Sequence, residues 1–273
     1  MFIRFYGTRG SIPVSGPKTI EYGGNTTCVY TESDSGEAIV IDAGSGIREL
    51  GLYLIKNNKN TIHLIFTHYH WDHIQGFPFF APIYSPKTTI NVYGPDKEVS
   101  PQKALSYQMK VPYFPTINLS SLPAKFNFKK FKSRFKIGSI NIQVIPNNHP
   151  NYTYGLKIKE KEKAVVFLTD NELYSPTPNT PFQKFVEFIK GADFLIHDAQ
   201  YNDEIYKSKT GWGHSTYSQV MELAEASSVK NVIFTHHDPF STDEFINKAL
   251  AEIRRRFPKH KIGAAKFGTE IKL

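Results

Sequence analysis

Hydrophobic and polar positions alternate in short blocks over the first half of the chain. Apolar runs of this length, rich in β-branched and aromatic residues, predict strands. These runs are residues 2–6, 26–31, 38–42, 62–66 and 89–93, and further strands are expected at 139–145, 153–159 and 164–168. A helix is expected at residues 47–55, after the turn that follows the run 38–42.

The second half changes to the longer spacing of amphipathic helices. Helices are expected at residues 182–190, at 217–226 after Ser215 or Thr216, and after the capping-box pattern Ser241-Thr242-Asp243-Glu244. Between them, 194–196 and 232–234 read as short buried strands, each followed at once by histidine and aspartate. By themselves these elements indicate an α/β or α+β fold with chemically capable residues at one rim of a sheet.

Composition supports a single globular unit. The chain has 273 residues, 40% of them hydrophobic, without a linker-like or low-complexity stretch, so we expect one domain over residues 1–273. No apolar run approaches the length of a membrane span, and Met1–Gly7 reads as a first strand rather than a signal peptide. A cytoplasmic location is the default expectation. The only cysteine, Cys28, is expected in the core.

The formal net charge of +8 is weak support for an anionic partner. Much of it lies in residues 125–136, where lysine and phenylalanine partly alternate. One interpretation is a hairpin with one solvated face. The other is a surface that steers phosphate-bearing substrates.

The segment Thr67–His73 carries the densest chemistry in the chain. It places His68, His70, Asp72 and His73 directly after an apolar strand. His68 and His70, two positions apart, point to one side of an extended chain, whereas Asp72 and His73 reach a second position beyond the turn. Nitrogen and oxygen donors without thiolate fit zinc, manganese or iron. The loop therefore predicts half of a two-metal centre.

Three later residues complete two ligand sets. His149 follows a strand, Asp170 ends the buried run 165–169, and His236 repeats the strand-Thr-His pattern of His68. Asp170 has two interpretations, a helix cap or a carboxylate that bridges two cations. The first set would be His68, His70 and His149, the second Asp72, His73 and His236, with Asp170 shared.

In this order the residues resemble the metallo-β-lactamase superfamily over residues 1 to about 240. The resemblance implies an αββα sandwich: two mixed sheets face to face, helices outside and metals at one rim. It also implies two divalent cations per chain, most simply zinc, with manganese or iron as alternatives. Asp42 matches the family's buried aspartate, which would brace the ligand loop.

The second half is similar to the phosphodiesterase branch that includes ribonuclease Z. Three segments carry this likeness: Asp198-Ala199-Gln200-Tyr201, Gly213-His214-Ser215-Thr216 and Phe234-Thr235-His236. The resemblance implies that Asp198 orients His214 and that His214 handles the proton of the leaving oxygen. Together with Asp72 these are the expected catalytic residues. His63 and His237 are expected to be structural.

One departure from ribonuclease Z bears on the substrate. That enzyme carries a long transfer-RNA-binding arm between the residues that match His149 and Asp170, whereas here only 20 residues separate them, enough for a β-hairpin. We therefore expect a phosphodiesterase that hydrolyses small or cyclic phosphodiesters, including cyclic nucleotides, by a bridging hydroxide. Two alternatives remain open: an RNA-processing nuclease without the arm, and a carboxylic or thioester hydrolase with the same metal site.

The expected partner is a small phosphodiester or nucleotide, with nucleic acid less favoured and no membrane. The branch resemblance also makes a homodimer a reasonable expectation. The apolar, proline-stiffened residues 109–115 have two interpretations. They could form a lid whose ring stacks on a nucleobase, or a loop packed against the sandwich.

Overall fold

Strands that are buried on both faces form the centre of this computed structural model, which describes residues 1–115 and 118–273. Successive side chains of a strand point to opposite faces of the sheet. In the run 38–41, Val40 belongs to one apolar cluster and Ile39 to another. In the run 163–168, Phe167 and Leu168 are divided in the same way. Each sheet therefore needs apolar cover on both sides.

The two sheets have seven strands each, as counted over the described residues. The first has the order β14-β1-β2-β3-β4-β5-β6. Its strands are β1 (Phe2–Gly7), β2 (Cys28–Glu32), β3 (Ala38–Ile41), β4 (Thr61–Ile65), β5 (Thr89–Tyr93), β6 (Lys125–Phe128) and β14 (Glu270–Lys272). β3, β4, β5 and β6 run parallel, so their carboxyl ends share one edge.

The second sheet has the order β13-β12-β11-β10-β9-β8-β7. Its strands are β7 (Arg134–Ile137), β8 (Ile140–Pro146), β9 (Tyr154–Glu160), β10 (Lys163–Leu168), β11 (Phe194–Asp198), β12 (Asn231–Thr235) and β13 (Lys261–Ala264). β10 to β13 run parallel, and β7 to β10 are antiparallel neighbours.

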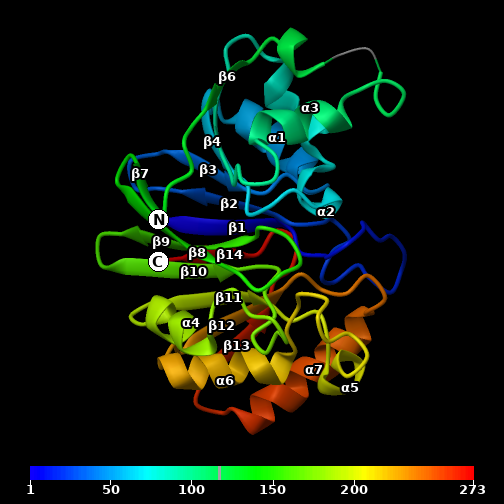
Figure 1. Cartoon of the computed structure of the whole chain (residues 1–273), viewed down its shortest axis with the longest axis vertical. Coiled ribbons are helices and arrows are strands. Elements are labelled where there is room, and N and C mark those ends of the chain that lie inside the picture. The colour runs from blue at the N-terminus through cyan, green and yellow to red at the C-terminus, as the bar shows by residue number, and fades with distance from the viewer. Residues whose placement is uncertain (116–117) are drawn as a thin grey trace.

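Helices cover the outer face of each sheet (Figure 1). On the first sheet lie α1 (Ile47–Lys56), α2 (Trp71–Ile74), α3 (Pro101–Gln108) and the short 3₁₀ helices η1 (Phe77–Phe79), η2 (Ala81–Tyr84) and η3 (Leu119–Ser121). On the second lie α4 (Phe182–Ile189), α6 (Tyr217–Ser227) and α7 (Asp243–Arg256), with the single turn α5 (Asp203–Tyr206) nearby. The layer order is therefore helix, sheet, sheet, helix.

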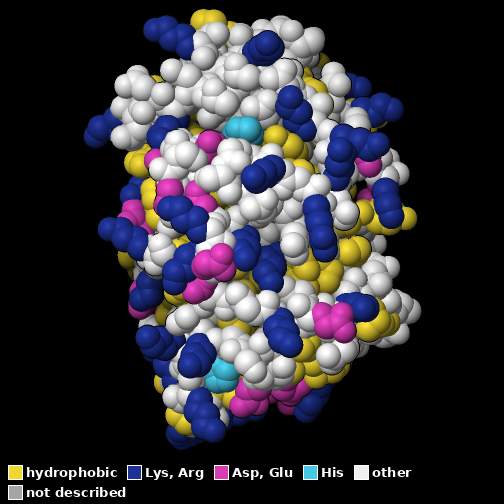
Figure 2. Space-filling model, turned by 90° about the vertical axis from the view of Figure 1, so that its left-hand side faces the viewer, with side chains coloured by type: hydrophobic (Ala, Val, Ile, Leu, Met, Phe, Trp, Pro, Cys, Tyr) yellow, Lys and Arg dark blue, Asp and Glu magenta, His cyan; other side chains and the backbone are white. Residues whose placement is uncertain are grey.

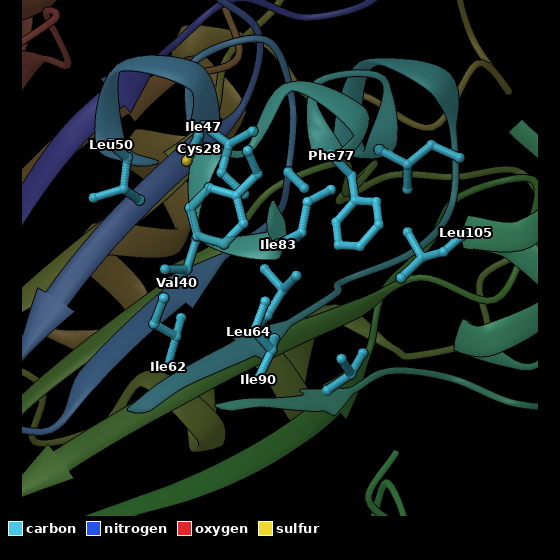
Figure 3. Packing of buried hydrophobic residues seen from close by; sticks show 14 of the residues in the cluster. Cys28, Val40, Ile47, Leu50, Ile62, Leu64, Phe77, Ile83, Ile90 and Leu105 are labelled. Atoms are coloured by element: carbon cyan, nitrogen blue, oxygen red, sulfur yellow. The ribbon is translucent and has the colours of Figure 1, made fainter. Parts of the chain in front are cut away.

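Three apolar clusters fill the three interfaces between these layers. The outer cluster of the first sheet, shown in Figure 3, includes Cys28, Val40, Ile47, Leu50, Ile62, Leu64, Phe77, Ile83, Ile90 and Leu105. The central cluster includes Ile3, Phe5, Ile39, Ile41, Ile65, Ile142, Leu156, Val165, Phe167 and Ile196. The outer cluster of the second sheet includes Val166, Leu168, Phe185, Leu195, Val220, Val232, Phe234, Ile246 and Leu250. The sandwich predicted from the sequence is confirmed.

The elements predicted from periodicity are found with shifts of one or two residues at their ends. Thr216 caps α6 in a capping box with Gln219. The capping box expected at residues 241–244 is wrong, because Thr242 rather than Ser241 caps α7, by accepting the Phe245 N–H. Periodicity did not predict α3, β13 and β14, nor the short helices α2, α5 and η1 to η3. The short run at β14 and the glycine in β13 give little periodic signal.

The expected hairpin within residues 125–136 is wrong. β6 pairs in parallel with β5 at the edge of the first sheet, whereas β7 pairs with β8 in the second. The alternation of lysine and phenylalanine reports one exposed face correctly, but it cannot distinguish two edge strands in different sheets from a hairpin. The 20 residues after His149 do form a hairpin, of β9 and β10.

Basic side chains are spread over the side of the molecule where β7 and both termini lie. Figure 2 shows them over the whole of this face, interspersed with acidic side chains. Within residues 1–115 and 118–273, no helix combines the length and apolar character that a membrane crossing needs.

Leu64→Ala is expected to destabilise the fold by about 2–5 kcal/mol, because Leu64 is fully buried in the outer cluster of the first sheet and truncation leaves a cavity. Urea unfolding would measure this free energy. Leu52→Ala, on the exposed side of α1, is the control and should change it by about 0.5 kcal/mol or less. Equal small effects at both positions would contradict the packing described here.

Candidate metal centre

The predicted ligands meet at the edge where parallel strands of both sheets end. Because parallel strands deliver their carboxyl ends to one edge, residues distant in sequence converge there. Asp42 follows β3, residues 67–73 follow β4, Asp170 follows β10, and His236 follows β12, while His149 follows the antiparallel strand β8.

The first ligand set is His68, His70, His149 and Asp170. One donor atom from each lies within 4.8 Å of all the others. Nε2 of His149 lies 3.1 Å from Nδ1 of His70 and 3.9 Å from Oδ1 of Asp170. His70 is the solvent-exposed member of the set, and His68 and Asp170 are buried.

The second set is Asp72, His73, His236 and again Asp170. Nε2 of His236 lies 3.1 Å from Oδ2 of Asp72 and 3.3 Å from Oδ1 of Asp170. Nε2 of His73 lies 3.2 Å from Oδ2 of Asp170. Oδ1 of Asp170 also lies 3.8 Å from Nε2 of His68, so this one carboxylate contacts members of both sets, as a bridging ligand would.

Hydrogen bonds at the far side of the rings leave the Nε2 lone pairs directed into the cluster. Nδ1 of His73 donates to Asp42 Oδ2 (2.8 Å), Nδ1 of His149 to the Gly213 carbonyl (3.1 Å), and Nδ1 of His236 to Gln200 Oε1 (3.0 Å). A histidine that donates through one nitrogen presents the other as a metal ligand.

The site fits a pair of cations. The buried Nε2 of His68 has no hydrogen-bond partner among the described residues. Nε2 of His73 faces Nε2 of His236 at 3.4 Å. Facing lone pairs repel unless a proton or cation lies beside them, and an unpartnered buried nitrogen is costly. A donor set of imidazole and carboxylate suits divalent zinc, manganese or iron.

The electrostatics of the cluster keep several ligands in the protonation state that binds a cation. Burial lowers the pKa of His68 well below its usual range and that of His149 to about 4, so both imidazoles are neutral at pH 7. Burial opposes ionisation of Asp170, but His236 and His73 outweigh it and hold the pKa of that carboxyl well below normal.

The carboxylates of the second ligand set stabilise positive charge on the neighbouring imidazoles. Burial lowers the pKa of His73 and His236, yet Asp170 and Asp72 overcome this effect and raise both pKa values. The second ligand set therefore holds a proton on imidazole unless another positive charge is present. A bound cation supplies that charge and displaces the proton.

Asp42 braces the ligand loop, at the position that the family resemblance implied. Its carboxylate accepts the backbone N–H and the hydroxyl of Thr67, both at 2.8 Å, in addition to Nδ1 of His73. The Thr67 oxygen lies 3.1 Å from Nδ1 of His68 and can accept its proton. One buried carboxylate thus orients a ligand of each set.

Two supporting contacts were missed in the sequence. The Ser11 backbone N–H donates to Asp72 Oδ2 at 2.7 Å, from a residue with φ of 63°. Gln200 orients His236, whereas in the sequence it stands out only as part of Asp198-Ala199-Gln200-Tyr201. A backbone donor leaves no residue-type signal, and a glutamine partner is visible only once the strand ends are placed.

Glu172 also supports the site, although the sequence analysis did not include it among the site residues. Its buried carboxylate accepts the N–H groups of Gly211 (2.8 Å) and Gly213 (3.0 Å) and the hydroxyl of Tyr206 (2.7 Å). Gly213, whose φ is 87°, offers its carbonyl to His149, and a Cβ there would come within 2.1 Å of that ring. Glu172 therefore positions the loop that holds both His149 and His214.

Asp198 and His214 lie beside both ligand sets. Asp198 Oδ2 accepts from Nδ1 of His214 at 3.2 Å, and its Oδ1 accepts the Asn171 N–H at 3.0 Å. Burial disfavours the Asp198 anion, but His197 and His214 lower its pKa below normal. The His214 ring lies 5.0 Å from that of His236 and 5.2 Å from that of His149, between centroids.

The two histidines expected to be structural lie outside both ligand sets. Nε2 of His237 is hydrogen-bonded to the Ala265 carbonyl at 3.0 Å, and burial lowers its pKa to about 3. His63 lies on β4, with its Nδ1 3.4 Å from the Tyr93 hydroxyl.

The family model described as "Beta-lactamase superfamily domain" matches residues 37–237, most of the chain. The chain belongs to the beta-lactamase superfamily. Ribonuclease Z from Clostridium kluyveri is 26% identical to it, covering 76% of this chain and 80% of that protein.

Solved structures agree with this fold. The metallo-β-lactamase fold protein YhfI from Bacillus subtilis superposes with a TM-score of 0.73 at 17% identity, covering 99% of both chains. A diphosphatase from the PhnP family has a TM-score of 0.71 at 20% identity, covering 100% of this chain and 97% of that one. Family membership together with the ligand clusters identifies this superfamily member as a metal-dependent hydrolase.

Asp170→Asn is expected to reduce bound metal from two ions per chain to one or none. Asparagine preserves the size of the side chain and tolerates the left-handed backbone at this position (φ 56°), but its amide cannot give an anionic oxygen to each cation. Elemental analysis after dialysis would measure the content. Asp193→Asn, at the opposite end of the strands, is the control, and two retained ions in Asp170→Asn would overturn the bridging assignment.

Proposed function

We propose that this protein is a dinuclear metal-dependent phosphodiesterase that hydrolyses small or cyclic phosphodiesters, cyclic nucleotides among them. The observation that carries the proposal is the place of His214, held by Asp198 and adjacent to both ligand sets. The second candidate is an RNA-processing nuclease, which is favoured by the relatives named ribonuclease Z.

The first cation would be held by His68, His70 and His149, and the second by Asp72, His73 and His236, with Asp170 shared. Zinc is the expected metal, and manganese and iron suit the same donors. Two such cations would supply an activated water near neutral pH and neutralise charge on the phosphate oxygens. Ser11 adds a backbone donor to Asp72 and so fixes the position of that carboxylate.

His214 is suited to donate a proton to the leaving oxygen. Because Nδ1 donates to Asp198, Nε2 is the ring nitrogen available for proton transfer. The buried Asp198 anion stabilises the charged imidazolium, and its contact with the Asn171 N–H prevents the carboxylate from turning away. Phosphodiesters have an alkoxide leaving group that benefits from such a donor, by a factor of about 10²–10⁴.

The surroundings of the site favour a small substrate over folded RNA. The 20 residues between His149 and Asp170 are used by the short β9–β10 hairpin. The basic stretch 125–136 is divided between β6 and β7, edge strands of different sheets, and Lys129 and Lys130 follow the carboxyl end of β6, on the ligand side of its sheet, so this stretch does not decide between the two substrates. The names of the relatives support the RNA alternative, and the two are separated by experiment.

A substrate panel should therefore show the highest catalytic efficiency with small phosphodiesters. The panel would contain bis-p-nitrophenyl phosphate, 2′,3′- and 3′,5′-cyclic nucleotides, precursor transfer RNA and a thioester, assayed with the zinc- or manganese-loaded protein. Cleavage of precursor transfer RNA at higher efficiency than any small diester would favour the nuclease. Preference for the thioester would reject phosphodiester chemistry.

His214→Ala should retain both metals and lose activity in proportion to how poor the leaving group is. For an alkoxide leaving group we expect a loss of about 10²–10⁴-fold, and much less for p-nitrophenolate, which departs without a proton. Rates across a series of leaving groups and the metal content would be measured together. His260→Ala, a histidine remote from the ligand sets, is the control. Equal losses for all leaving groups would show that His214 is not the proton donor.

A further inference from the structure

An apolar cavity of about 630 Å³ adjoins the metal-ligand loop. Six aromatic side chains form much of its wall: Tyr69, Trp71, Phe79, Tyr107, Tyr113 and Phe114. Among the described residues that line it, none carries a charge. The volume lies within the range of about 300–1,000 Å³ typical of small-molecule sites.

The cavity lies next to the loop that carries His70, a member of the first ligand set. Tyr69 and Trp71 are the two chain neighbours of His70, so their Cα atoms lie about 3.8 Å from that of His70. His70 is also the solvent-exposed ligand of its set. A substrate bound at this set would extend past Tyr69 or Trp71 to enter the cavity.

The wall exposes unusually large ring surfaces. Tyr113 is 80% exposed, Trp71 72% and Phe79 62%. Aromatic side chains are normally buried in a folded protein. Rings that line a cavity and stay this exposed are typical of a binding surface.

Residues 109–115 combine both of the roles that the sequence left open. Met109 is buried, and the Phe114 ring packs edge-on against Phe79 with centroids 6.0 Å apart, which anchors the segment to η1. Tyr113, between these anchors, remains exposed at the cavity. The segment is therefore a packed loop that presents one ring.

One polar group in the wall is suited to orient a ligand. Nε2 of Gln108 is buried and has no hydrogen-bond partner among residues 1–115 and 118–273. The other glutamine of the wall, Gln75, already donates to Thr26 Oγ1 at 3.1 Å. When the Gln108 side chain turns toward the cavity, this unpaired amide donor gives a ring with a hydrogen-bond acceptor a preferred orientation.

We propose that this cavity binds an uncharged planar aromatic group carried by the substrate. The proposal rests on the phosphodiesterase function above and narrows its substrate class to diesters with one aromatic or heteroaromatic ester. A nucleic-acid backbone is disfavoured here because no lining residue carries a charge to pair with its phosphates; the Lys110 ammonium, which is not in the lining, lies over the Tyr107 ring, 4.8 Å from its centroid.

The ester concerned is the one that stays on phosphorus. His214, the donor to the leaving oxygen, comes from the second half of the chain and lies against His149 and His236. The cavity is built entirely from the first half, beside His70. The leaving group and the retained group thus face different walls.

The test compares two diesters with the same leaving group, p-nitrophenyl phenyl phosphate and p-nitrophenyl methyl phosphate. Because the bond broken is the same, a difference reports the retained ester. The phenyl diester should have a kcat/KM about tenfold or more higher, mostly through KM. Equal values would overturn the cavity proposal while the phosphodiesterase function stands, and no hydrolysis of either diester would instead reject the function.

Tyr113→Ala should reduce the phenyl-to-methyl ratio severalfold, and Tyr113→Phe should keep it, since the ring matters and the hydroxyl does not. Tyr113 is remote in sequence from every proposed ligand, so its replacement leaves the ligand loop intact. Trp71→Ala would change a residue within that loop. Phe240→Ala removes an aromatic ring of similar exposure that does not line the cavity, and should leave the ratio unchanged. A ratio insensitive to Tyr113→Ala would contradict the proposal.

An equilibrium measurement does not depend on turnover. In a Trp212→Phe background, Trp71 is the only tryptophan, and diphenyl phosphate should change its fluorescence at a concentration at least tenfold lower than dimethyl phosphate. Sedimentation of Tyr113→Ala tests the competing occupant, a second copy of the chain. Loss of a dimer with unchanged diphenyl phosphate binding would assign the cavity to the chain interface and overturn the proposal.

Discussion

Two ionised carboxylates buried at the junction of the sheets govern the rest of this structure. Asp72 and Asp170 are 5% and 1% exposed, and charge in such a place is costly unless it is neutralised nearby. The imidazoles of His73 and His236 respond with raised pKa values. The cluster is therefore stable only with protons or cations in it, and metal binding becomes a property of the fold as much as of the individual ligands.

The sheets supply the rigidity that such a cluster requires. The strands that lead to the ligands, β4, β8, β10 and β12, end at the same edge, and each has a neighbouring strand on both sides, so the ligand segments begin from firmly held backbone. Beyond the strand ends, buried carboxylates take over. Asp42 holds the loop of His68 and His73, and Glu172 holds the loop of His149 and His214. Ligand orientation thus depends on a few strong acceptors rather than on the ligands themselves.

The two halves of the chain contribute differently around this shared centre. The second half provides Asp198 and His214, whose hydrogen bond suits them to act on the leaving oxygen. The first half provides the uncharged aromatic wall beside His70. In the proposed function, the groups for reaction chemistry and the groups for substrate choice therefore lie on different loops of one framework.

Features that depend on neighbours in sequence were determined by the sequence itself. The strand period, the cap at Thr216 and the spacing of His68, His70, Asp72 and His73 are local. By themselves the elements indicated an α/β or α+β fold, and the family resemblance carried by the ligand spacing supplied the sandwich. Nonlocal features were decided only in the tertiary structure. β6 and β7 could not be assigned to different sheets, because an exposed edge strand looks the same in either. Three other features join segments that are far apart in sequence, and no local pattern predicts such contacts. They are the partners of Glu172, the Ser11 donor to Asp72 and the aromatic cavity. Only the packing of the two halves brings these groups together.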